Sequence, residues 1–161
     1  MAYFQNPEVS FEVPDDWVDQ TAVVYVERIR RGIPASVTLV RNAISAADSL
    51  EARARDTVRR LTTQVPGTVV LEQNAINIGG TVPAVQLLLQ CKHSLESVTQ
   101  LITLFVRDGT FWALTATSPT ARLETLDPIF EHVLGSLHVA KPQVVSDQLG
   151  PSGTEQHRRR E

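Results

Sequence analysis

The sequence predicts one α+β domain: a curved antiparallel β-sheet of about seven strands with two main helices packed on one face. Seven short segments rich in β-branched and aromatic residues are separated by turn residues, which is typical of strands. Two other segments place apolar residues at helical spacing. One lies between the third and fourth strands and the other follows the last strand, so helices do not alternate with strands as in a parallel α/β protein. With 161 residues, of which 42% are hydrophobic and 20% charged, the chain can build one ordinary core.

Three strands are expected before the first helix. The second and third contain Val, Ile, Tyr and Thr in close succession, and Gly32 and Pro34 punctuate the turn between them. Between the first two strands, Pro14 fixes its φ angle and is followed by two aspartates, which predicts a tight turn, with Trp17 anchoring that turn to the core. The three strands are predicted over residues 8–13, 21–29 and 35–41.

The first helix is expected to open at Asp48. Asp48 and Glu51 have the spacing of a capping box, in which each side chain accepts from a backbone amide of the first turn. Pro66 and Gly67 end the helix. Its apolar stripe is predicted to consist of Leu50, Ala54, Val58 or Thr57, Leu61 and Val65.

Four strands and a second helix complete the domain. Gly79-Gly80 and Asp108-Gly109 are hairpin turn signals, and they divide the strands predicted over residues 68–78, 82–92, 97–107 and 110–117. Ser118-Pro119 and Asp127-Pro128 are helix-start signals, so a helix is expected over about 128–138. Its packed face is predicted to hold Ile129, Phe130, Val133, Leu134 and Leu137.

The domain is expected to span residues 1–140, followed by a disordered tail over 141–161. Pro, Gly, Ser, Gln and charged residues dominate that tail, which leaves too little apolar surface to fold. Its Arg158–Arg160 run is interpreted as a solvated end. The start of the chain lacks the basic and apolar regions of a signal peptide, and no apolar run is long enough to span a bilayer. A cytoplasmic location without membrane insertion is therefore expected.

The composition and the scattered polar residues argue against several function classes. A net charge of −3 does not provide the basic surface that nucleic-acid binding needs. The single cysteine, Cys91, falls in an apolar strand and is interpreted as a small buried hydrophobe. No metal-ligand spacing, phosphate-binding loop or nucleophile motif is present, so neither an enzyme nor a cofactor is expected. The four histidines are isolated from one another: His93, His132, His138 and His157.

The strands carry apolar residues on both faces. An antiparallel sheet covered on one side usually shows polar residues on the other. In residues 97–107, Ile102 and Leu104 lie on one face while Leu101 and Phe105 lie on the other. Part of this surface is expected to meet a second copy, a client protein or a tightly curved part of the same sheet. Glutamines interleaved with the apolar residues could pair with polar groups of a bound helix, and they are Gln86, Gln90 and Gln100.

The N-terminal pattern resembles a known family. Residues 11–21 read Phe-Glu-Val-Pro-Asp-Asp-Trp-Val-Asp-Gln-Thr, and a helix closes the domain near Gly135-Ser136-Leu137. This arrangement resembles the DcrB-like, PsbP-related family, and in particular the Eag-type chaperones of type VI secretion effectors. The resemblance covers roughly residues 3–139. It implies a PsbP-like fold and a homodimer that shields the N-terminal transmembrane helices of an effector before loading and export.

The resemblance also implies a client-binding groove on the sheet. The residues matching the family's groove positions are Ala22, Val24, Val26, Thr38, Val40 and Gln100. Where the family often has a second polar residue on the first helix, this chain has Thr57, whose hydroxyl makes fewer hydrogen bonds. The alternative reading is a PsbP-like, non-enzymatic module that recognises a folded partner through its loops or through the arginines of the first helix.

Overall fold

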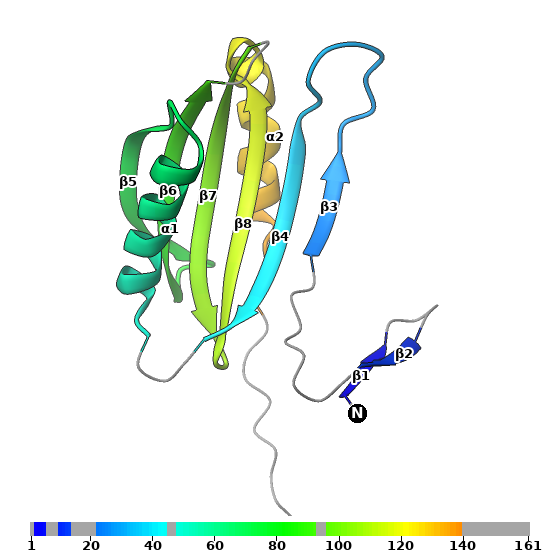
Figure 1. Cartoon of the computed structure of the whole chain (residues 1–161), viewed down its shortest axis with the longest axis vertical. Helices are drawn as coiled ribbons and strands as arrows, with labels where there is room; N and C mark the ends of the chain where they lie inside the picture. Colours follow the sequence, from blue (N-terminus) through cyan, green and yellow to red (C-terminus); the bar gives the residue numbers. More distant parts are fainter. Residues whose placement is uncertain (1, 6–9, 14–21, 45–47, 93–95, 140–161) are drawn as a thin grey trace, which may run out of the picture.

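A computed structural model describes residues 2–5, 10–13, 22–44, 48–92 and 96–139 (Figure 1). Trp17 and the turn predicted before it lie outside the described residues, as does the tail from residue 140. The described residues form eight strands, two α-helices and one 3-10 turn. In chain order these are β1 (Ala2–Gln5), β2 (Ser10–Val13), β3 (Ala22–Val26), β4 (Ser36–Ala43), α1 (Leu50–Gln64), β5 (Val69–Ile78), β6 (Val82–Lys92), β7 (Ser97–Arg107), β8 (Thr110–Pro119), the 3-10 turn (Thr120–Arg122) and α2 (Leu123–Gly135).

The predicted α+β class with an antiparallel sheet is confirmed, with a six-stranded main sheet in the order β3-β4-β8-β7-β6-β5. Every neighbouring pair is antiparallel. The segment predicted as the first strand of that sheet, β2, pairs with β1 in a separate two-stranded sheet. The four residues between β1 and β2 make this local pairing inexpensive in loop-closure entropy. The strand β1 was not expected from the sequence.

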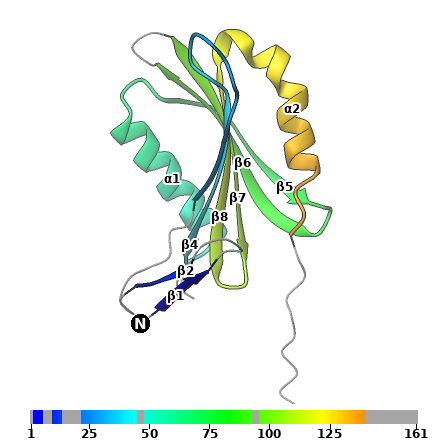
Figure 2. The same ribbon diagram turned by 90° about the vertical axis from the view of Figure 1, so that its right-hand side faces the viewer.

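The two helices pack on opposite faces of the sheet, so the prediction that both cover one face is wrong. Leu101 and Ile102 are neighbours on β7, and their side chains therefore point to opposite faces. Ile102 belongs to the cluster around Ala54 of α1, whereas Leu101 packs against the cluster around Phe130 of α2. Figure 2 shows the sheet between the two helices. Strands that are apolar on both faces gain more burial when each face has its own helix.

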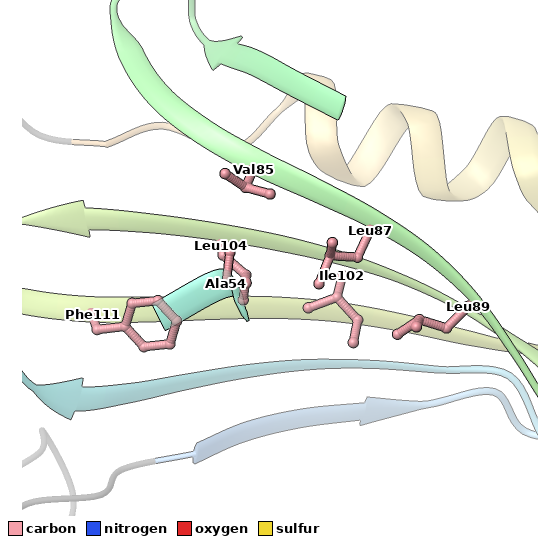
Figure 3. Close-up of a cluster of buried hydrophobic side chains, with 7 residues drawn as sticks. All are labelled: Ala54, Val85, Leu87, Leu89, Ile102, Leu104 and Phe111. Atoms are coloured by element: carbon pink, nitrogen blue, oxygen red, sulfur yellow. The ribbon is translucent and has the colours of Figure 1, made fainter. Parts of the chain in front are cut away.

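The largest cluster of buried apolar residues in the described part of the chain lies between α1 and the sheet (Figure 3). Leu87, Leu89 and Leu104 have no exposed surface. Ala54 is the one buried residue of α1 and belongs to this cluster with residues of the sheet. The cluster consists of Ala54, Val85, Leu87, Leu89, Ile102, Leu104 and Phe111.

The first helix begins one residue later than predicted. Ser49 is the N-cap, and its hydroxyl accepts from the Ala52 amide at 3.1 Å. Asp48 instead makes an ion pair with Arg53 at 2.7 Å. Both residue types are good caps, so the choice depends on the arginine one turn away, which holds the aspartate.

The second helix begins before the predicted Asp127-Pro128 start. Ser118 and Pro119 are the last residues of β8, and Pro128 lies inside α2. Leu126 and Phe130, each 5% exposed, are one turn apart and dock the helix on the sheet. Their burial offsets the hydrogen bond that Pro128 cannot donate. Ile129, predicted on the packed face, is 54% exposed.

Both predicted hairpin turns are present. Asp108 and Gly109 have φ angles of 49° and 68°, and Gly79 and Gly80 have 57° and 74°. Positive φ at both central residues suits the twist of a two-residue hairpin. None of the described helices is long and apolar enough to cross a membrane.

Candidate functional site

The β3 strand is exposed along its whole length. Its sequence, Ala-Val-Val-Tyr-Val, contains no charge, and every residue is exposed. Val24 and Val26 are 55% and 57% exposed on one face, and Tyr25 is 73% exposed on the other. Solvated edge strands usually carry charged residues or proline, which discourage association. An uncharged and exposed edge strand is therefore a candidate contact surface.

Six of the seven predicted client-binding residues lie on strands, on the sheet face that carries α1. Three come from alternate positions of β3 and two from alternate positions of β4, with Ala22 opposite Val40 and Val24 opposite Thr38. Through β8 the same face continues to Gln100 on β7. We call the residues on the two outer strands the β3–β4 strip, which consists of Ala22, Val24, Val26, Thr38 and Val40.

The helix α1 does not cover the β3–β4 strip. In Figure 1, α1 lies in front of β5 and β6 and beside β7, and neither of the two described helices lies in front of β4 or β3. The Arg53 guanidinium reaches over the ring of Phe111 on β8, at 6.0 Å from its centroid. Thr57, the seventh predicted residue, is half-buried and follows Arg53 by one turn on the same side of the helix. Thr57 is thereby placed on the flank of α1 that borders the open part of the sheet.

Gln100 lies on β7, on the sheet face that carries α1, in a chain of polar side chains. Its amide nitrogen donates to the Thr117 hydroxyl at 3.4 Å, and its amide oxygen lies 3.9 Å from the sulfur of Cys91. The Thr68 hydroxyl donates to the same sulfur at 3.3 Å. These contacts are long, so the amide keeps hydrogen-bonding capacity for a further partner.

The connection from β3 to β4 is held by polar contacts. Glu27, directly after β3, accepts from both terminal nitrogens of Arg122, with one contact at 2.8 Å, and also from the Ala35 amide at 3.1 Å. The Ile33 amide donates to Glu96 at 3.3 Å. The hydrogen bond from Arg122, followed by that from Ala35, lowers the pKa of Glu27 from 4.5 to about 2. We call this group the Glu27–Arg122 clamp.

A second feature, which the sequence analysis missed, is a cavity of about 460 Å³ on the opposite face. It lies between α2 and strands β5, β6 and β7. Its floor is apolar and includes Leu88, Leu101 and Phe130. Four carboxylates line it, all on exposed residues: Glu72, Glu124, Asp127 and Glu131. They come from two distant segments, so no local motif in the sequence indicates the cavity.

A family model described as DcrB matches residues 8–136, which is most of the chain. The chain belongs to the DcrB family. A comparison with curated protein sequences gave no match.

Solved structures support the fold of this DcrB-family protein. A Pseudomonas aeruginosa protein of unknown function, PA94, described as a putative regulator, has a TM-score of 0.72 at 22% identity, covering 88% of this chain and 98% of the other. The cyanobacterial PsbP of Synechocystis sp. PCC 6803 has a TM-score of 0.53 at 12% identity, covering 86% and 92%. LpqN of Mycobacterium tuberculosis, described as involved in cell envelope biogenesis, has a TM-score of 0.50 at 18% identity, covering 74% and 76%. At these identities the similarities show the PsbP-like fold alone.

Proposed function

We propose that this DcrB-family protein is a cytoplasmic chaperone or adaptor. It binds and shields the N-terminal transmembrane helices of a type VI secretion effector before the effector is loaded and exported. The observation that carries the proposal is β3, an uncharged strand whose five residues are all exposed beside a part of the sheet that neither described helix covers. The proposal assigns no catalytic role to the chain.

A transmembrane helix has the chemistry that suits the β3–β4 strip. Such a segment presents about 20 apolar residues, which need cover while they are in water. Helices in membranes associate through packing of small residues and through hydrogen bonds from polar side chains. Valine and threonine on the strip offer a surface of this kind, and the half-satisfied amide of Gln100 offers the hydrogen bond.

The energy available is large enough for a chaperone with broad selectivity. Burying roughly 1,000 Å² of apolar surface contributes on the order of 25 kcal/mol before association and ordering costs are subtracted. Shape and hydrophobicity then dominate recognition, and the precise client sequence matters less.

Homodimerisation is part of the proposal. The outer edge of β3 has no strand partner among the described residues. A second copy placed along this margin would extend the apolar surface available to a client and reduce the exposure of the edge. The oligomeric state is measured directly by light scattering of the purified chain.

Co-expression tests the proposal. The probe is a soluble reporter with an N-terminal apolar segment of about 20 residues rich in Ala, Leu and Gly. We expect the wild-type chain to keep this reporter soluble and to purify with it. The double variant Val24→Gln/Val26→Gln should lose at least about 90% of the captured reporter, because it places two polar groups in the strip.

Val69→Gln is the matched control. Val69 is 54% exposed, like Val24, but lies on the opposite face at the other end of the sheet. Capture by this variant should equal that of the wild type. Equal capture by the Val24→Gln/Val26→Gln variant would contradict the proposal and favour the alternative, a module that binds a folded partner through loops or the α1 arginines. Failure of the wild type to capture any apolar segment would overturn it.

A further inference from the structure

The cavity under α2 combines an apolar floor with a rim of one charge sign. Among the residues that the structure describes, the lining includes the carboxylates of Glu72, Glu124, Asp127 and Glu131 and no Lys, Arg or His. Within the described ranges, none of these four carboxylates makes an ion pair; Glu72 accepts only from the Asn74 amide at 3.4 Å. The negative charge on the rim is therefore not neutralised by the residues that the structure describes.

A metal ion does not suit this arrangement. No three His, Cys, Asp or Glu residues in the described part of the chain lie close enough together to hold one. The carboxylates are distributed around an apolar floor that includes Leu88, Leu101 and Phe130. An elongated ligand that carries both cationic and apolar side chains matches such a surface.

The chain itself contains a segment with these properties. His157 is followed by Arg158, Arg159 and Arg160, and the tail also carries the apolar residues Val144, Val145 and Leu149. Arginine is well suited to this role, because its planar guanidinium pairs with carboxylates and stacks on apolar surface.

The last described residues before the tail lie near a strand that lines the cavity. Leu137 and Val139, the last described residues with apolar side chains, pack with the cluster that includes Ile78 and Ile76 of β5. Ile76 is two residues from Asn74, which lines the cavity, and both lie on the α2 face. Eighteen residues, 140–157, separate Val139 from Arg158. The root-mean-square span expected for a linker of this length is roughly 20–25 Å, and a tether of that span gives an effective concentration in about the millimolar range.

We propose that the arginines at residues 158–160 of the chain's own tail dock on the acidic rim of the α2-face cavity, in the same molecule, with apolar tail residues over its floor. Each exposed arginine–carboxylate pair is weak, so docking depends on several pairs formed together. This site is independent of the β3–β4 strip, because the two lie on opposite faces of the sheet.

Paramagnetic NMR on the full chain tests the proposal. A nitroxide is attached to a cysteine introduced by Ser152→Cys; Cys91 is buried, and the chain without Ser152→Cys, treated identically, is the labelling control. We expect broadening of the amides of β5 around Glu72 and of α2 around Glu131. The broadening should be lost in about 0.5 M NaCl, where exposed pairs are screened.

Two sets of variants distinguish rim docking from chance contact. Broadening should be lost in Arg158→Ser/Arg159→Ser/Arg160→Ser and in Glu124→Gln/Glu131→Gln, all of which change exposed or tail residues and leave the core intact. The control Glu51→Gln/Asp56→Asn neutralises two exposed carboxylates of α1 on the other face and should keep it.

Three outcomes would overturn the proposal. They are the absence of broadening on α2 and β5, its persistence in both test variants, or its appearance only between a labelled copy and a separate isotope-labelled copy. The last outcome would assign the cavity to the tail of another molecule.

Discussion

The centre and the margin of the main sheet are stabilised in different ways. In the centre, β6 and β7 are covered by α1 on one face and by α2 on the other, and Leu87 and Leu104 are fully buried. At the margin, β3 has side chains exposed by 44–73% at its last four positions, and the polar Glu27–Arg122 clamp holds the loop that follows it. Apolar packing thus stabilises the centre, and the margin keeps its apolar side chains available for contact.

The largest expected change in unfolding free energy comes from truncating a buried side chain at the centre of the sheet. Leu104→Ala should reduce the free energy of unfolding by about 3 kcal/mol, because it leaves a cavity in a fully packed cluster. Val24→Ala at the margin should change it by about 0.5 kcal/mol or less. Urea unfolding followed by circular dichroism measures both.

Val85 is the matched buried valine. It is 8% exposed, and Val85→Ala should reduce the free energy of unfolding by about 2 kcal/mol. Equal costs at Val24 and Val85 would show that the margin is covered in solution.

Removing the N-cap of α1 should change the unfolding free energy by a smaller amount. Ser49→Ala removes the hydroxyl that accepts from the Ala52 amide, and it should cost about 1 kcal/mol of unfolding free energy. Ser49→Asp keeps an acceptor and should restore most of that loss in the same urea experiment. If Ser49→Ala were neutral and Asp48→Ala costly, the cap would be Asp48, as the sequence pattern predicted.

Gln100 tests whether the margin recognises polar groups of a client. Gln100→Leu removes an amide whose hydrogen bonds within the protein are long. We expect about a threefold loss of affinity for an apolar helix that contains serine, the value of roughly half of one ordinary hydrogen bond. Affinity for an all-leucine helix should not fall. Fluorescence titration with the two peptides measures both values, and an equal loss for both would contradict a hydrogen-bonding role.

The smallest expected effect is a change in acid sensitivity at the margin. Because the pKa of Glu27 is about 2 in the folded chain and 4.5 is its ordinary value, the clamp contributes stability above pH 4.5 and loses it as the pH falls towards 2. Glu27→Gln should therefore show a shallower fall of the urea midpoint across this range. Arg122→Gln should act in the same direction. Salt should weaken the effect, because both side chains are partly exposed. An unchanged pH profile in both variants would exclude the clamp as its cause.

Features determined by neighbouring residues were predictable from the sequence. Alternation along β6 and β7 gave the two faces correctly, because side-chain direction in a strand has a period of two. Asp108-Gly109 gave its hairpin because few residue pairs adopt positive φ at both positions. The residues of the β3–β4 strip share one face for the same local reason, and their role in client binding stays a prediction.

Features determined by long-range packing were not predictable in the same way. Nothing near α2 in the sequence specifies which face it covers; this follows from the burial of Leu126 and Phe130 against β8 and the β3–β4 loop. The acidic cavity joins Glu72 of β5 to Glu131 of α2, which are far apart in the chain. Ser49 replaced Asp48 as the cap because an arginine five residues beyond Asp48 pairs with it.

The strand order has a consequence for the stage of synthesis at which the main sheet can be completed. β4 is made before α1, yet it pairs with β8, the last strand of the sheet. The β5–β8 meander forms from neighbours in the chain, and such local contacts form early in folding. A ribosome must therefore complete nearly the whole domain before β3 and β4 can dock. Under the proposed function, a nascent copy would therefore not yet present the β3–β4 strip to a client, and capture would begin only after β8 has paired with β4.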